Sequence, residues 1–130
     1  MGDRKRILVV DDQEEIRDLV AAVLAGEGFE VVTAEDGRRA LLTAFREPFD
    51  LVLLDINMPD MDGWETLRLL KADDGLRGTP VVMFSIRGEI RSKVQGMQFG
   101  AIGYITKPFA VDELVAGVRA ALAGQAPRSR

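Results

Sequence analysis

The sequence contains no cysteine and no histidine among its 130 residues. The absence of cysteine excludes disulfides and thiolate metal sites, and it suits a reducing cytoplasm. The absence of histidine excludes a Ser-His-Asp triad and removes the most common zinc ligand and general base. Any chemistry of this chain must therefore use carboxylates, hydroxyls, amines and the backbone.

Long hydrophobic runs and an excess of positive charge are also missing. No apolar run approaches the roughly 20 residues needed to span a bilayer, and the charged start is unlike a signal peptide. The net charge is −4, which argues against nucleic-acid binding because that binding needs Lys and Arg to neutralise phosphates. We therefore expect a cytoplasmic protein with no membrane insertion and no direct nucleic-acid binding.

Short apolar, β-branched runs alternate with longer amphipathic ones, which is typical of βαβ units and a parallel sheet. The predicted strands are Ile7–Val10, Glu30–Thr33, Leu51–Leu54, Val81–Phe84 and Gly103–Ile105. The predicted helices are 13–26, 37–46, 63–73, 88–99 and 110–123. The second strand is the most polar and suits an edge of the sheet. In the first helix we expect one apolar stripe, made by Ile16, Leu19, Val20, Val23 and Leu24.

A chain of this length fits one domain, and five such units predict a doubly wound α/β domain. We assign the domain to residues 1–124, and residues 125–130 to a disordered tail or the start of a linker. No output module follows, so the chain is either a complete single-domain protein or the N-terminal part of a longer one cut near Pro127.

Polar residues follow four of the five predicted strands. Asp11 and Asp12 come after the first strand, Asp55 after the third, Ser85 after the fourth and Lys107 after the fifth. Parallel strands end at one edge of a sheet, where ligands of such folds bind. Taken singly, such residues are usually turn residues, helix caps or solvated surface charges. Their joint placement favours a functional site instead.

Each residue type in this set suits phosphoryl transfer. Carboxylates packed together repel one another unless a cation lies among them, and an oxygen-only site with few protein ligands favours Mg²⁺. A carboxylate can also act as a nucleophile and form an aspartyl-phosphate. An ammonium and a hydroxyl would help to neutralise and position the phosphoryl oxygens.

The sequence resembles the receiver domain of bacterial two-component response regulators from Ile7 to about Leu122. The matching motifs are residues 7–12, 50–63, 84–85, 100–101 and 104–109. The resemblance implies a five-stranded parallel sheet with flavodoxin-like strand order 2-1-3-4-5 and helices on both faces. It also implies a signalling switch rather than a metabolic enzyme.

The resemblance assigns the phosphoryl chemistry to Asp55. This residue would accept a phosphoryl group from a sensor histidine kinase, a histidine phosphotransfer protein or a small acyl phosphate, and would discharge it slowly. The metal ligands for Mg²⁺ would be Asp12, Asp55 and the backbone carbonyl of Asn57, with Asp11 nearby or acting through water.

Further roles carried over by the resemblance concern the phosphoryl group and the switch. Lys107 would pair with the phosphoryl group, Ser85 would donate a hydrogen bond to it, and the Lys107–Pro108 peptide would be cis. Ser85 would then move toward the phosphate and Tyr104 would turn inward, changing the surface of the fourth helix, fifth strand and fifth helix. That surface would contact a downstream protein target or form a phosphorylation-dependent dimer. Without the resemblance, Tyr104 is an ordinary half-buried strand aromatic.

Some residues depart from the family pattern. Ile86 stands where a small residue is usual, so its bulk is expected to alter phosphorylation or dephosphorylation, and Arg87 follows it. Ile102 and Gly103 replace residues that are commonly polar. Two alternatives stay open: a degenerate receiver that binds partners without phosphate, and a Mg²⁺-dependent phosphatase. The second would need a carboxylate two residues after Asp55, where Asn57 stands.

Overall fold

The protein is a parallel α/β sandwich, seen here in a computed structural model that describes residues 4–86 and 100–124. Its five strands form one parallel sheet in the order β2-β1-β3-β4-β5. The strands are β1 (Arg6–Val10), β2 (Glu30–Ala34), β3 (Leu51–Asp55), β4 (Val81–Ile86) and β5 (Gly103–Lys107). The predicted strand order is confirmed.

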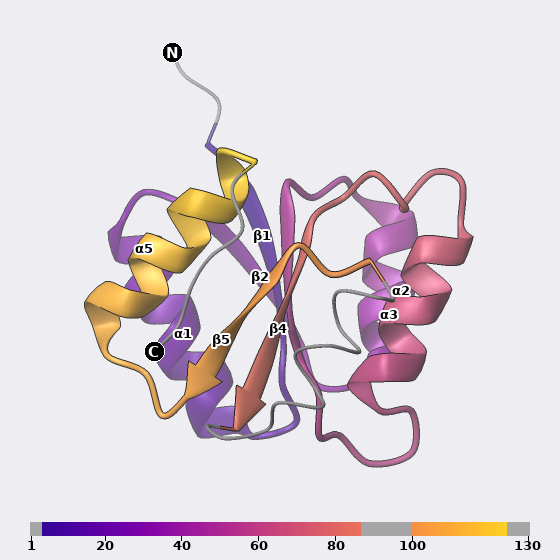
Figure 1. The fold of residues 1–130 in the computed structure, drawn as a ribbon, viewed down its shortest axis with the longest axis horizontal. Helices are drawn as coiled ribbons and strands as arrows, with labels where there is room; N and C mark the ends of the chain where they lie inside the picture. The colour runs from indigo at the N-terminus through magenta and orange to yellow at the C-terminus, as the bar shows by residue number, and fades with distance from the viewer. Residues whose placement is uncertain (1–3, 87–99, 125–130) are drawn as a thin grey trace.

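Helices cover both faces of the sheet. They are α1 (Glu14–Gly26), α2 (Gly37–Arg46), α3 (Gly63–Ala72) and α5 (Val111–Leu122). Figure 1 shows α1 and α5 against one face and α2 and α3 against the other. The predicted helix 88–99 and the predicted tail 125–130 lie outside the described residues. In the described part of the chain, no helix has the length and apolar character to cross a membrane.

Two apolar cores form on the two sides of the central strands. In β1, Leu8 and Val10 belong to the core under α2 and α3, whereas Ile7 and Val9 belong to the core under α1 and α5. All four side chains are fully buried. This two-sided burial explains the continuous apolar runs, because a parallel sheet covered on both faces has no solvated side.

Two further expectations concern exposure. β2 lies at an edge of the sheet, as predicted. The predicted apolar stripe of α1 wrongly included Leu19. Val20 and Leu24 are buried, but Leu19 is 48% exposed. At 100° per residue, Leu19 lies at the margin of the arc centred on Val20 and Leu24, and the sheet does not reach that margin.

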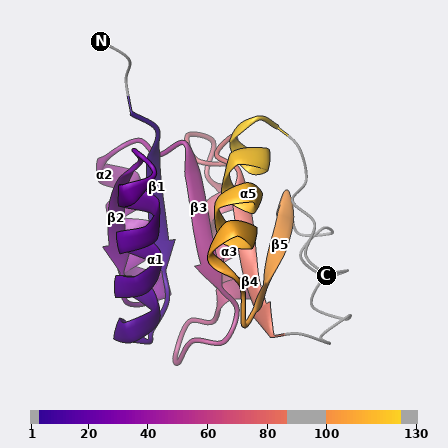
Figure 2. The same cartoon turned by 90° about the vertical axis from the view of Figure 1, so that its left-hand side faces the viewer.

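All five strands run in one direction, so their C-terminal ends lie at the same edge of the sheet (Figure 2). Four of the five strands extend further toward this edge than predicted, while β1 ends at Val10 as expected. Asp55 pairs in register with Phe84, and Ser85 with Thr106. Lys107 is the last residue of β5. Asp55, Ser85 and Lys107 are therefore strand residues rather than residues of the following loops.

Candidate functional site

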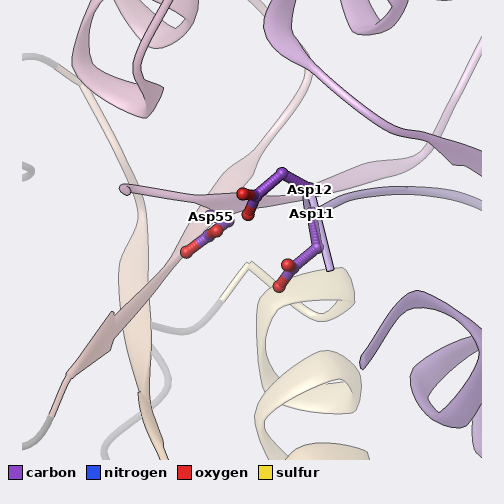
Figure 3. Close-up of side chains that lie close together, drawn as sticks. All are labelled: Asp11, Asp12 and Asp55. Carbon is purple, nitrogen blue, oxygen red and sulfur yellow. The ribbon is translucent and has the colours of Figure 1, made fainter. Parts of the chain in front are cut away.

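Three carboxylates gather at the C-terminal edge of the sheet (Figure 3). Asp11 and Asp12 directly follow β1, and Asp55 ends β3. One oxygen from each lies within 4.8 Å of the others. Asp11 is 0% exposed and Asp55 5% exposed, whereas Asp12 is exposed. The cluster thus has two buried members and one that faces solvent.

Lys107 lies between the two buried carboxylates. Its Nζ donates to Asp11 Oδ2 at 2.7 Å and to Asp55 Oδ1 at 3.1 Å. The ammonium also lies 5.4 Å from the centroid of the Phe84 ring, which stacks on Phe109 at 5.7 Å. Cations are attracted to aromatic faces at this range. The two rings therefore help to hold the ammonium at the site.

Asp11 is anchored on three sides. Its carboxylate Oδ1 accepts the Gln13 N–H at 2.9 Å, and its own N–H donates to the Ala34 carbonyl at 3.2 Å. Its carbonyl accepts a hydrogen bond from Arg17 Nη1 at 2.8 Å. Both carboxylate oxygens already have hydrogen-bond donors, one from Gln13 and one from Lys107. The position of Asp11 is thus fixed by β2, α1 and β5 together.

The protonation of Asp55 reflects its burial. Loss of solvent raises the pKa of this carboxyl from 3.8 to about 6, and Lys107 acts against the rise. The negative charges of Asp11 and, more weakly, Asp12 raise the pKa further. Each cause follows from the same physics, because burial and like charges disfavour the ionised form and an opposite charge favours it. A bound cation would favour ionisation of Asp55.

The loop after β3 is closed by Gly63. Its N–H donates to the Ile56 carbonyl at 2.9 Å, and a Cβ at this position would lie 2.2 Å from the Asp55 carbonyl oxygen. Asp62 caps α3 by accepting the Glu65 N–H at 2.9 Å. The cap is visible in the sequence as an Asp before an apolar periodic run. The close approach of Gly63 to Asp55 was missed, because it depends on how α3 packs on β3.

The structure places the other predicted residues as follows. Asn57 is an exposed residue of the loop after β3, two residues from Asp55. Tyr104 is half-buried and packs against the core under α2 and α3. The Lys107–Pro108 peptide is cis, as predicted. Ser85 belongs to β4, but its side chain, that of Ile86 and all of Arg87 are outside the described residues.

The donor set suits a hard cation and an anion side by side. Three carboxylates and one ammonium leave a surplus of negative charge when all are ionised. Oxygen ligands of this kind are those that Mg²⁺ and Ca²⁺ prefer. The partly buried ammonium of Lys107 could in turn pair with a phosphoryl group.

The comparison with known families settles what kind of domain this is. The model of the response regulator receiver domain matches residues 7–119. This chain belongs to the receiver domain family of response regulators. Its members are phosphoryl-accepting domains of signalling proteins, which agrees with the prediction that the chain is a switch and not a metabolic enzyme.

Curated relatives of this receiver domain include a DNA-binding response regulator and a transcriptional regulatory protein. The response regulator MtrA of Mycobacterium tuberculosis is 47% identical over 121 residues, which cover 92% of this chain and 51% of that protein. The phosphate regulon regulatory protein PhoB of Klebsiella pneumoniae is 44% identical over 119 residues, covering 91% and 52%. The chain therefore spans about half the length of these relatives.

Solved structures of receiver domains share the fold. The chemotaxis protein CheY4 of Vibrio cholerae superposes with a TM-score of 0.86 at 34% identity, covering 90% of this chain and 98% of that one. The receiver domain of NtrX from Brucella abortus gives 0.84 at 40% identity, again covering 90% and 98%.

The prediction of no direct nucleic-acid binding is wrong, because relatives of this chain are DNA-binding proteins. MtrA is described as a DNA-binding response regulator, and RpaA of Synechocystis, 40% identical over 117 residues, as a DNA-binding dual master transcriptional regulator. Receiver domains therefore occur in DNA-binding proteins. The net charge of a receiver domain reports on its own surface and does not exclude DNA binding by a protein that contains one.

Proposed function

We propose that this receiver domain is a phosphorylation-controlled switch in which Asp55 accepts a phosphoryl group from a histidine kinase or a histidine phosphotransfer protein. The observation that carries the proposal is the burial of the Asp55 carboxylate beside the Lys107 ammonium, 3.1 Å away, at the edge where Asp11 and Asp12 also lie. A buried nucleophile next to a cation suits attack on an electron-rich phosphoryl group.

The proposed reaction moves one phosphoryl group and no proton. Ionised Asp55 attacks phosphorus through a carboxylate oxygen, the new O–P bond forms, and the bond from phosphorus to the donor's imidazole nitrogen breaks. That nitrogen keeps the electron pair, and the imidazole leaves as the neutral ring because its other nitrogen carries a proton throughout. Lys107 loses one of its carboxylate contacts and pairs with a phosphoryl oxygen. The Ser85 hydroxyl is proposed to donate to a second phosphoryl oxygen.

Asp12, Asp55 and the Asn57 carbonyl are the proposed ligands of Mg²⁺, with Asp11 acting through water. Support comes from the hydrogen bonds of Asp11, since both of its carboxylate oxygens already accept donors while Asp12 is exposed. When bound, Mg²⁺ supplies positive charge that neutralises the phosphoryl oxygens in the transition state. Asp12 would hold the cation directly, and Asp11 would hold it through a water molecule.

The output of the switch is proposed to be a changed surface that includes β5 and α5, while the predicted fourth helix lies outside the described residues. Ser85 moves toward the phosphoryl group and Tyr104 turns inward behind it. Tyr104 of β5 pairs in register with Met83 of β4, two residues before Ser85. A movement of Ser85 could therefore be passed to Tyr104 through the paired strands. In a ¹H–¹⁵N spectrum, beryllofluoride with Mg²⁺ should shift amides of 103–122 in the wild type and fewer of them in Tyr104→Ala.

The direct test is incubation with Mg²⁺ and acetyl phosphate, followed by intact mass measurement. We expect one phosphoryl adduct on the wild type and none on Asp55→Asn. Asp50→Asn is the matched control, because Asp50 directly precedes β3 while Asp55 ends it, and it should be modified like the wild type. Omitting Mg²⁺ should strongly reduce the adduct.

Other outcomes would point to the alternatives. No adduct on the wild type at saturating donor, with Mg²⁺ present, would leave a degenerate receiver that acts without phosphate. Rapid multiple turnover of phosphate monoesters would instead indicate a phosphatase. An adduct that persists in Asp55→Asn would contradict the assignment of Asp55.

A further inference from the structure

Helix α2 exposes two large hydrophobic side chains next to each other. Leu42 is 46% exposed and Phe45 is 60% exposed, and residues three apart on a helix lie on the same side. The other exposed large hydrophobic side chains of the described residues, Leu19 and Val111, stand singly on α1 and α5. Single exposed apolar residues are ordinary, whereas an adjacent pair marks a candidate contact surface.

The same side of α2 is basic. Arg38, Arg39 and Arg46 are exposed, and α2 contains no acidic residue, although the chain as a whole has a net charge of −4. Within the described part of the chain, neither Arg38 nor Arg46 forms an ion pair. We call the surface made by Arg38, Arg39, Leu42, Phe45 and Arg46 the α2 patch.

The acidic residues that flank α2 do not neutralise the α2 patch. Asp36 is the N-cap of the helix and accepts the backbone N–H of Arg39 at 2.8 Å. Glu47 is engaged in an ion pair with Arg6. Glu35 lies 3.9 Å from the Arg39 guanidinium, but both groups are exposed and such pairs contribute little. The α2 patch therefore keeps a local excess of positive charge.

The α2 patch is held on a rigid support. Gly37, Ala40 and Ala44 of the same helix are buried, and a Cβ at Gly37 would lie 2.1 Å from Thr66 Oγ1 of α3. This tight packing fixes the outer side of α2 in place. A partner would find the surface already formed and would not have to order it, which favours binding.

We propose that the α2 patch is a docking surface for a protein partner that presents an acidic amphipathic helix. The apolar centre of the patch suits apolar side chains at i, i+3, i+4 and i+7 of such a helix. The arginines at its margins suit Glu or Asp beside that stripe. A membrane surface is the poorer match, because insertion needs a broad apolar side and Ala40, Leu41 and Ala44 pack into the core.

A model peptide tests the proposal on the unphosphorylated full chain. The probe is a helical peptide of roughly 16 residues with Leu at i, i+3, i+4 and i+7 and Glu beside them. We expect saturable ¹H–¹⁵N shifts confined to residues 37–46 and their neighbours. Leu42→Ala or Phe45→Ala should weaken binding about tenfold, and the double variant Arg38→Glu with Arg46→Glu at least as much.

Matched control variants distinguish binding at the α2 patch from nonspecific binding of the peptide. Leu19→Ala removes an equally exposed leucine from α1, and Arg77→Glu reverses an exposed charge in the loop after α3. Both variants should bind the peptide like the wild type. All of these variants change exposed side chains, and circular dichroism with thermal unfolding checks that each remains folded.

Several results would overturn the proposal. A peptide with Lys in place of Glu that binds equally well would remove the charge argument. Shifts on α1 or α5 rather than α2, or no saturable shift at millimolar peptide, would contradict the assignment of the binding surface to the α2 patch. Binding to phosphatidylserine vesicles in place of the peptide would show that the α2 patch contacts lipid rather than a protein helix.

Discussion

The N-terminal edge of the sheet, where the strands begin, and the C-terminal edge, where they end, carry similar charges in different surroundings. At the N-terminal edge, Arg6 donates from Nε to Glu30 at 2.7 Å and from its backbone N–H to Asp50 at 2.7 Å, and it also pairs with Glu47. That is one cation among three carboxylates. At the C-terminal edge, Lys107 is likewise one cation among three carboxylates.

Burial separates the two edges. The side chains of Glu30 and Glu47 are 51% and 41% exposed, so water screens the repulsion between them. At the other edge, the Asp11 and Asp55 side chains are 0% and 7% exposed. Buried like charges raise the free energy of the folded state. The C-terminal edge is therefore the one that needs a further cation, and burial rather than charge count identifies the site.

The largest effect on stability should come from backbone clearance at the C-terminal edge. Gly63→Ala would push a Cβ to 2.2 Å from the Asp55 carbonyl oxygen, and we expect a loss of about 3 kcal/mol in the free energy of unfolding. Gly78→Ala in the loop before β4 is the control, because its Cβ would have no neighbour within 4 Å. Urea unfolding measures both. Equal losses in the two variants would contradict the tight contact at Gly63.

Removing one carboxylate should change the free energy of unfolding in opposite directions at the two edges. A pKa raised from 3.8 to about 6 means that ionised Asp55 opposes folding, so Asp55→Asn should gain about 2 kcal/mol at pH 8 without divalent cations. Asp50→Ala removes the acceptor of the Arg6 N–H and should lose about 1–2 kcal/mol. The measurement is urea unfolding in EDTA. A loss of stability in both variants would refute the contrast between the edges.

The stability that Asp55→Asn gains over the wild type should increase as pH rises. The folded-state pKa of Asp55 lies above the ordinary value, so protons bind the folded state more tightly and the wild type loses stability as pH rises from 3.8 to about 6. The gap between variant and wild type should therefore open across that window and stay constant above it. Unfolding curves from pH 4 to 8 check this, and a gap independent of pH would rule out the raised pKa.

The smallest effect should come from an exposed carboxylate at the N-terminal edge. Glu30→Gln removes the 2.7 Å ion pair with Arg6, but exposed pairs contribute little, and we expect Tm to fall by no more than about 2 °C. The shift should shrink further in high salt. Scanning calorimetry at two salt concentrations measures it, and a shift as large as that of Gly63→Ala would contradict the screening argument.

The strands, the described helices and their burial could be predicted from hydrophobic pattern and chain direction, whereas the strand order came from the resemblance to receiver domains. Continuous apolar runs such as Leu51–Leu54 predict strands buried on both faces, and the polar β2 predicts an edge. The same reasoning placed Asp11, Asp12, Asp55 and Lys107 at one edge, since parallel strands end together. Only the strand lengths were underestimated, because pairing of Asp55 and Lys107 with neighbouring strands is not visible in a local pattern.

Features that depend on contacts between distant segments could not be predicted. The exposure of Leu19 depends on how far the sheet extends beneath α1. The clearance at Gly63 depends on how α3 packs on β3, and the hold on Lys107 depends on the stacking of Phe84 and Phe109. The exclusion of nucleic acid failed for another reason, since it took the charge of a domain as evidence about the proteins that contain such domains.

The central claim, that the carboxylate cluster of Asp11, Asp12 and Asp55 at the C-terminal edge forms a site for Mg²⁺, is tested most directly by the effect of Mg²⁺ on stability. Urea unfolding is compared in Mg²⁺ and in NaCl of equal ionic strength, for the wild type and for Asp12→Asn. A ligand that binds the folded state stabilises it by mass action, so Mg²⁺ should raise the unfolding free energy of the wild type and have much less effect on Asp12→Asn. No specific effect of Mg²⁺ on the wild type, or an equal effect on both proteins, would contradict the claim.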